Sequence, residues 1–376
     1  MRSRHLFSVK LRLASTGRGS PRPRPTGGPL DRVTLKDIAH QVGVSVMTVS
    51  NVVNGRTERV SPATAARVER AVADLGYVPS AAARSLVARR SRLVGLLLPG
   101  RPDGVSLLAS PHDVAVTGAL EAALRERDHH LMLRGVGDAA DVRDSVRRWG
   151  LDGVVVMGFT DAALAGLDLP PAVPAVLVDV DGGTGPAERP ARAHVRSDDR
   201  AGGRLAGAHL AGLGHRGLLL CGPVDGASRV VAERLAGFRE AAADAGLPAD
   251  AVRVAHARTT YDEGVALGPR LADDVRAGTV TAVLATADVL AAGVVRGLTD
   301  AGLRVPADVS VLGYDDAELA RQVTPRLSTV AQDTAGKGRL AAELLLGLVT
   351  GEDAAPRSAT VPVALVARET TGPAPS

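Results

Sequence analysis

Apolar residues recur at helical spacing in three short segments near the start of the chain. The first segment runs from Leu35 to Val42, with Thr34 and Asp37 in the positions of a capping box. Gly43 follows this segment, and glycine readily takes the positive φ that ends a helix. The pattern therefore predicts a short helix that begins after Thr34 and ends at Gly43.

Two further helices are predicted on the same grounds. Ser45 stands as an N-cap before a segment with valines along one side. Ser61 and Pro62 have the residue types of an N-cap and a first helical position, and Gly76 ends the segment that follows. Two short helices joined by a tight turn form a helix-turn-helix, in which the second helix enters the major groove of DNA. The third helix completes a small all-α head.

From Leu93 onward, short apolar runs alternate with amphipathic helical segments. This alternation predicts parallel sheets with helices on both faces. The runs form two sets of about four, so we expect an α/β body of two periplasmic-binding-protein-like lobes, with a ligand cleft at the carboxyl ends of the strands. The predicted strands are 93–99, 130–135, 153–157 and 175–180 in the first lobe, and 217–222, 252–256, 281–286 and 309–314 in the second.

The charge of the chain divides at the same place as the pattern. Residues 1–92 hold 17 Lys and Arg against 5 Asp and Glu, whereas residues 93–376 hold 28 against 36. A small basic head on a large acidic body is typical of a polyanion-binding module joined to another domain.

The first 32 residues are predicted to be a disordered basic tail, because they hold eight basic residues, one acidic residue and a Pro/Gly/Ser-rich run. Lys10 and Arg12 interrupt their only apolar stretch, so no secretory signal is expected. No apolar run has the roughly 20 residues of a membrane span, which predicts a cytoplasmic protein without membrane contact. The predicted domains are the tail 1–32, the DNA-binding domain 33–78, a short helix and linker 79–92, the two-lobed body 93–368 and a second tail 369–376.

The second predicted helix carries the candidate readers of DNA bases. An Asn side chain can bond the adenine edge at two points, whereas Val and Met pack on methyl groups or sugars. Hydroxyl side chains near helix starts suit phosphate contacts, although a capping role alone also accounts for Ser45 and Ser61. The candidate residues are Val46, Met47, Ser50, Asn51 and Asn54 for the bases, and Thr34, Ser45, Thr48 and Ser61 for the phosphates.

These segments resemble the DNA-binding region of the LacI/GalR family of bacterial transcription regulators. The matching stretches are VTLKDIAHQVGVSVMTVSNVVNG and RVSPATAARVERAVADLGYVPSAAARSL. The resemblance implies that residues 81–87 form a hinge helix that folds on the operator, with Ala83 and Leu86 contacting DNA and Leu86 wedged between base pairs. Many members have Arg at the position of Asn51, so an adenine-type reader here replaces a guanine-type reader.

The body is similar to the effector-binding body of the same family. The matching stretches include DDRAGGRLAGAHLAGLGHRG, ATADVLAAGVVRGLTDAGLRVPADVSVLGYDD and TPRLSTVAQD. The resemblance implies that the protein binds a near-palindromic DNA operator as a homodimer. It favours a repressor over an activator. It also implies that a small, sugar-like effector between the lobes modulates the affinity for the operator.

Six candidate effector-binding residues lie just after predicted strands or on the helices that follow them. Carboxylates and an Arg fork suit polyhydroxyl ligands, and a Tyr can stack on the apolar face of a sugar. Turn formation, surface ion pairs and packing are the ordinary alternatives for the same residues. Met157 and Ala287 stand where some members have polar residues. The six candidates are Asp179, Arg234, Tyr261, Asp288, Asp315 and Gln332.

Two other classes of protein fit single features of the chain. A periplasmic-type binding protein shares the two-lobed body, but the basic head and the missing export signal disfavour it. A nucleotide-dependent α/β enzyme fits GVGDAA at 135–140, which matches G-x-G-x-x-A after a strand but lacks a clear ribose-binding acid. The nine histidines show no H-E-x-x-H spacing, and the single cysteine, Cys221, is flanked by leucines. The sequence therefore predicts no metal, no cofactor and no enzymatic activity.

Overall fold

The structure, a computed structural model, describes residues 33–78, 90–100, 106–167, 169–170, 172–180, 192–226, 228–351 and 357–375. The chain forms two compact units, Met1–Ala83 and Arg84–Ser376. The predicted basic tail and the predicted DNA contacts Ala83 and Leu86 lie outside the described residues.

The first unit contains the three predicted helices, α1 (Leu35–Val42), α2 (Val46–Val53) and α3 (Pro62–Asp74). The capping box at the start of α1 is present, because the amide of Thr34 donates to the carboxylate of Asp37 at 2.8 Å and the hydroxyl of Thr34 accepts from the amide of Asp37. Gly43 ends α1 with φ 72°. The three helices bury one small core around the fully buried Ile38, Val49 and Val68.

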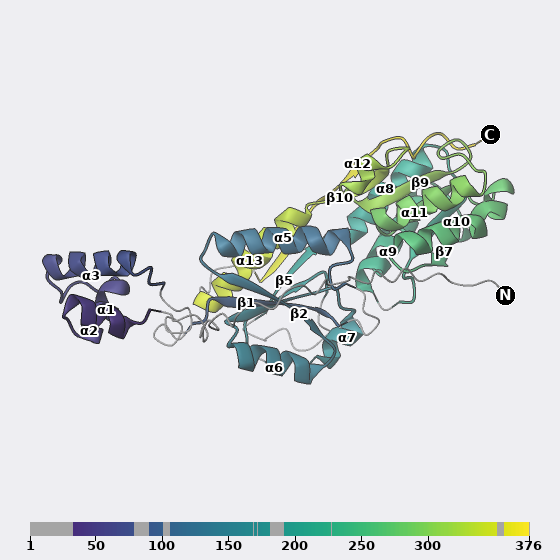
Figure 1. The fold of residues 1–376 in the computed structure, drawn as a ribbon. Coiled ribbons are helices and arrows are strands. Elements are labelled where there is room, and N and C mark those ends of the chain that lie inside the picture. Colours follow the sequence, from purple (N-terminus) through teal and green to yellow (C-terminus); the bar gives the residue numbers. More distant parts are fainter. Residues whose placement is uncertain are drawn as a thin grey trace, which may run out of the picture. The chain divides into compact units, whose positions relative to one another are not determined.

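The second unit begins with a lobe built on a fully parallel six-stranded sheet of order β11-β5-β4-β3-β1-β2. Two helices, α5 (Pro111–Arg125) and α13 (Thr334–Thr350), cover one face, and α6 (Ala139–Trp149) and α7 (Asp161–Gly166) cover the other (Figure 1). The strands are β1 (Leu93–Pro99), β2 (His130–Val136), β3 (Gly153–Met157), β4 (Ala175–Val178), β5 (Arg192–Ser197) and β11 (Ser358–Val361).

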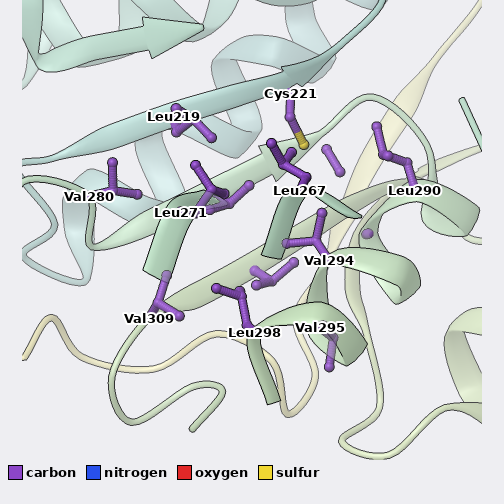
Figure 2. Close-up of a cluster of buried hydrophobic side chains, with 14 of the residues drawn as sticks. Leu219, Cys221, Leu267, Leu271, Val280, Leu290, Val294, Val295, Leu298 and Val309 are labelled. Atoms are coloured by element: carbon purple, nitrogen blue, oxygen red, sulfur yellow. The ribbon is translucent and has the colours of Figure 1, made fainter. Parts of the chain in front are cut away.

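The other lobe has a sheet of order β12-β10-β9-β8-β6-β7, parallel except that β12 runs antiparallel to β10. Helices α8 (Asp199–Gly212) and α9 (Arg229–Asp244) cover one face, and α10 (Tyr261–Arg276) and α11 (Asp288–Asp300) cover the other. Figure 2 shows the core under α10 and α11, in which the sulfur of Cys221 lies among leucine and valine side chains. The strands are β6 (Leu218–Gly222), β7 (Val252–His256), β8 (Ala282–Ala285), β9 (Ser310–Asp315), β10 (Ser328–Gln332) and β12 (Val363–Val366), and short helices span Ala249–Ala251 (η1) and Leu319–Gln322 (α12).

All eight predicted strands are present, but the sequence pattern missed β5, β10, β11 and β12. The missed strand β5 reads RAHVRS, and its charged side chains leave only every second residue buried. Such alternation is typical of a strand near the edge of a sheet and is weak over six residues. The fourth predicted strand is too long, because β4 ends at Val178 where Asp179 takes φ 59°.

The chain passes between the lobes at three places. Strand β5 leads into α8, β10 leads into α13, and β11 leads into β12. The first and third crossings are tied together, because the amide of Asp198 donates to the carbonyl of Val361 at 3.0 Å. The carboxyl ends of both sheets therefore meet at one junction.

The last residues differ from the predicted tail. Thr370 is fully buried, its hydroxyl accepts from the amide of Ser328 at 2.8 Å, and its carbonyl accepts from the amide of Val311 at 2.8 Å. The buried ring of His215 lies 3.1 Å from the carbonyl of Gly372 and 3.0 Å from the hydroxyl of Ser310. Residues 369–375 are therefore a packed part of the second lobe.

We predict that His215 makes the second lobe sensitive to acid. Burial lowers the pKa of His215, although the Gly372 carbonyl opposes the shift. A ring that stays neutral in the folded protein stabilises the fold fully at pH values above the unfolded pKa of about 6.5. This stabilisation is lost as the pH falls through the lower pKa of the folded state. Melting temperatures measured from pH 7.5 to pH 5 should fall more steeply for the wild type than for His215→Gln. Parallel curves would contradict the prediction.

Candidate functional site

A cavity of about 320 Å³ lies between the lobes, at the carboxyl ends of both sheets. This volume is at the lower end of the range for small-molecule sites. Four of the six candidate effector residues, Asp179, Arg234, Asp315 and Gln332, line the cavity. The other lining residues are Ser110, His112, Asp113, Met157, Gly158, Phe159, Thr160, Pro223, Asp225, Ser228, Val230, Val231, Thr259, Thr286 and Ala287.

The guanidinium of Arg234 enters the cavity from α9 and is held on three sides. Its Nε donates to Oδ1 of Asp199 at 2.9 Å, and its Nη1 donates to the carbonyl of Thr286 at 2.6 Å. Its central carbon lies 3.5 Å from the centre of the Tyr314 ring, which is a cation–π contact. Burial disfavours the charge, but Asp199, Tyr314 and Asp315 together raise the pKa of Arg234 above its ordinary value. Arg234 is therefore a fixed cation in the cavity wall.

Asp179 lies on the opposite wall, in a group of polar residues centred on Lys337 of α13. The fully buried Nζ of Lys337 lies 2.8 Å and 2.7 Å from the two carboxylate oxygens of Asp179. It also lies 2.9 Å from Oε1 of Gln332 and 3.2 Å from Nε2 of His112. Burial alone would raise the pKa of Asp179, but the charges of Lys337 and His112 outweigh burial and lower it. Asp179 is therefore an ionised acceptor in the cavity wall.

Gln332, the last residue of β10, joins the two lobes. Its Oε1 accepts from the hydroxyl of Ser197 at 2.6 Å, and its Nε2 donates to Oδ1 of Asp315 at 2.5 Å. Asp315 has φ 122°, a conformation that costs on the order of 1–3 kcal/mol for a residue other than glycine. Burial raises the pKa of Asp315, against the opposing charges of His112 and Arg234.

Two of the predicted effector residues do not line the cavity. Asp288 is fully buried, where its carboxylate accepts from the hydroxyl of Thr329 at 2.6 Å and from the amide of Ala317 at 2.8 Å. Burial, followed by the charge of Asp315, raises the pKa of Asp288 well above its ordinary value. Tyr261 is the first residue of α10 and 41% exposed. In this structure Asp288 supports the loop after β9, and Tyr261 lies outside the cavity wall.

Sequence reasoning missed Lys337, His112 and Asp199. The sequence could have singled out Lys337 as a buried cation. It is one of only three lysines among 45 basic residues, and it stands at an apolar position of a helix. His112 and Asp199 lie at the starts of α5 and α8, where a polar residue already has a capping explanation. Only the packing of helices within each lobe shows that His112 faces Lys337 and that Asp199 faces Arg234.

On the DNA-binding unit, α2 presents the predicted base readers. Val46 and Met47 are exposed, and within the described residues the side chain of Asn51 makes no hydrogen bond. The amide of Asn54, by contrast, donates to the carbonyl of Ser50 at 2.7 Å, so it already has a partner. The predicted phosphate contacts Thr34, Ser45 and Ser61 are all N-caps, and Thr48 lies 2.9 Å from the Ser45 hydroxyl.

The features that suggested catalysis have structural explanations. The carboxylate of Asp138 accepts from the amides of Ala140 at 2.8 Å and Asp141 at 2.9 Å, so it fills the helix start in GVGDAA where a phosphate would bind. Cys221 is fully buried, and burial raises the pKa of its thiol to about 12. Over the part of the chain that the structure covers, no group of acidic, His or Cys residues is arranged to hold a metal. No helix within the same part is long and apolar enough to cross a membrane.

Comparison with known proteins agrees with this arrangement. The family described as bacterial regulatory proteins, lacI family, matches residues 34–80, and a periplasmic binding protein-like domain matches residues 208–371. The chain is 36% identical to the HTH-type transcriptional regulator CelR of Thermobifida fusca, over 90% of this chain and 98% of that protein. It is 31% identical to the ribose operon repressor of Haemophilus influenzae, over 83% of this chain and 91% of that protein.

Solved structures show the same similarity. The lac repressor dimer bound to operator and the anti-inducer ONPF has a TM-score of 0.76 at 28% identity, and the match covers 91% of this chain and all of that chain. The CelR–cellobiose complex has a TM-score of 0.64 at 32% identity, and the match covers 90% of this chain and all of that chain. A ribose-bound regulator from Enterococcus faecium has a TM-score of 0.64 at 25% identity, over 75% of this chain and 99% of that chain.

A helix-turn-helix unit joined to a two-lobed body with a cavity between the lobes defines a ligand-responsive regulator of transcription. The chain belongs to the LacI family of bacterial regulatory proteins. The predicted family, the two-lobed fold and the function as a DNA-binding transcriptional regulator are thereby confirmed.

We predict that the position of Arg234 depends on the absence of a side chain at Gly203. A Cβ on Gly203 of α8 would lie 2.0 Å from the carbonyl oxygen of Arg234, so Gly203→Ala must push α9 away. Overpacking of this kind costs about 1–3 kcal/mol. Gly212→Ala, at the end of the same helix and with open space around it, should be neutral or slightly stabilising. Chemical denaturation of both variants checks this, and equal stabilities would contradict it.

Proposed function

We propose that this regulator is a cytoplasmic repressor without enzymatic activity, which binds a near-palindromic operator as a homodimer. A small polyhydroxyl effector, bound between the lobes of the body, sets its affinity for the operator. The cavity that joins Arg234 and Asp315 of one lobe with Asp179 of the other is the observation that supports this proposal most directly.

The chemistry of the cavity wall favours a sugar-like ligand. Ionised Asp179 supplies acceptors, the guanidinium of Arg234 supplies donors, and Asp315 stands beside the amide of Gln332. Hydroxyl groups both donate and accept, so a polyol can satisfy all of these groups at once. Phe159 offers an apolar ring in the same wall. Cellobiose and ribose, the sugars bound in the solved structures of two similar regulators, are therefore the first ligands to test.

The DNA-binding unit supports the other half of the proposal. Val46, Met47 and Asn51 lie on the recognition helix and are free to contact base edges, whereas Ser45 and Ser61 present hydroxyls at helix starts. Ala83 and Leu86, assigned to DNA by the family resemblance, complete the proposed interface in the minor groove.

We predict that Asp315→Asn weakens effector binding while operator binding is retained. The substitution keeps the shape of the side chain and removes its charge, so loss of a buried acceptor should cost about 1–3 kcal/mol of binding free energy. Arg234 is tested together with its partner, as Arg234→Met with Asp199→Asn, because removing Arg234 alone would leave Asp199 buried and unpaired. Calorimetric titration with cellobiose and ribose measures the effect.

The control is Arg296→Ala, which removes an exposed arginine of α11 that pairs with Asp300. Coupling between sites is reciprocal, so operator DNA must change the sugar affinity by the same factor by which the sugar changes DNA affinity. Sugar affinities that are equal with and without operator, in the wild type and in both cavity variants, would contradict the proposed coupling.

We also predict that Asn51→Arg changes the operator preference. Arg bonds the guanine edge, whereas Asn bonds the adenine edge, and each good pair is worth about 1–3 kcal/mol of discrimination. Selection of binding sites from random DNA should show a shift from A·T toward G·C at one symmetric position in each half-site. The same selected sites for both proteins would show that Asn51 does not read a base.

A further inference from the structure

Lys337 is a basic side chain beside the cavity that does not itself line it. It is fully buried, and its ammonium group has three donors for three nearby oxygen atoms, two of Asp179 and one of Gln332. Nε2 of His112 lies 3.2 Å from the same ammonium, and Asp179, Gln332 and His112 all line the cavity. Lys337 therefore lies directly behind the wall that a ligand would touch.

Two glycines beside Lys337 allow this placement. A Cβ on Gly338 would lie 2.6 Å from the carbonyl oxygen of Val116, so α13 and α5 touch backbone to backbone at this point. A Cβ on Gly336 would lie 2.2 Å from the carboxylate of Asp333. The close approach carries Lys337 to the start of α5, where His112 lies, and leaves little space for a bulkier cation.

The charge of Lys337 lowers the pKa of Asp179. Burial favours the neutral acid, and the largest opposing contribution comes from Lys337. His112 of α5 and Arg234 of α9 also lower the pKa of Asp179. The nearby carboxylate of Asp199 on α8 opposes them, because two negative charges repel each other. Without the ammonium, the pKa of Asp179 would rise, because burial would keep its effect while the largest opposing charge would be gone.

We propose that Lys337 is a positioning residue of the effector site, whose ammonium fixes Asp179 and Gln332 as oriented hydrogen-bonding groups for the ligand. The proposal rests on the function proposed above. Because Gln332 ends β10 at the second crossing between the lobes, Lys337 also ties this crossing to the first lobe. The contacts of Lys337 with Asp179, Gln332 and His112 all join residues that the structure describes.

The test compares three full-length variants in titrations with cellobiose and with ribose. Lys337→Met removes the charge and keeps the length of the side chain, and should weaken binding at least tenfold. Lys337→Arg keeps the charge but replaces a compact ammonium with a planar fork, so it should not restore binding. Arg339→Met is the matched control, since it removes an exposed cation from the same helix, and should bind like the wild type.

The pH dependence of binding separates positioning from a purely structural role. Comparing the proteins in a His112→Gln background removes the imidazole that lies 3.4 Å from the carboxylate of Asp179. The raised pKa of Asp315 acts in both proteins, so the difference between their pH profiles from pH 6 to pH 8 reports on Asp179. With Lys337→Met, the affinity should fall more steeply as the pH is lowered than with Lys337 present, because the pKa of Asp179 is then higher.

A double variant distinguishes a loss of binding from misfolding. Lys337→Met with Asp179→Asn removes both buried charges, so its melting temperature should recover toward the wild type while sugar binding stays weak. Wild-type sugar affinity in Lys337→Met at all pH values would overturn the proposal.

If the wild type itself binds neither sugar, the proposed sugar effector fails, and hydrogen exchange still tests Lys337. Exchange at residues 332–334 should rise in the double variant, where stability is recovered, and should stay unchanged in Arg296→Ala, whose partner Asp300 lies outside this segment. Equal exchange in the double variant and the wild type would overturn the positioning role.

Discussion

The structure of the body depends on one constraint, which is that the chain passes between its two lobes at three adjacent points. The first crossing follows Ser197 and the second follows Gln332, and the third lies between Val361 and Val363. Each crossing leaves a sheet at its carboxyl end, where side chains emerge from neighbouring parallel strands and converge. The same constraint that joins the lobes therefore also collects the polar groups of the cavity, because Gln332 hydrogen-bonds to Ser197 on one side and to Asp315 on the other.

The buried charges of the site are paired inside each lobe. Lys337 and Asp179 both belong to the first lobe, whereas Arg234 and Asp199 both belong to the second. Burying an ion costs several kcal/mol, and a close partner with further hydrogen bonds is needed to offset this cost. Lys337 meets this requirement through Gln332, and Arg234 meets it through a carbonyl and an aromatic face. A change in the relative position of the lobes therefore need not break either ion pair.

The sequence predicted those features that depend on local pattern. Caps at Thr34, Ser45 and Ser61 stood beside clear helical periodicity, and central strands such as 153–157 are apolar throughout, so both were found. Residues 369–375 were mistaken for a tail, because their stability comes from hydrogen bonds to distant groups such as Ser328 and His215. Tyr261 and Asp288 were placed at the cavity by their position after strands and by the family resemblance. The exposure of Tyr261 and the contact of Asp288 with Thr329 depend on tertiary packing that no local pattern encodes.

The distribution of charged and neutral contacts suits a protein that must change state. Hydrogen bonds of Gln332, such as the one from Ser197, link the two lobes across the cavity. A net hydrogen bond is worth about 1 kcal/mol, whereas breaking a buried ion pair costs about 3–5 kcal/mol. Two arrangements of the lobes that differ only in such hydrogen bonds can lie within a few kcal/mol of each other. A ligand that binds one arrangement more tightly by a similar amount is then sufficient to shift the population between them.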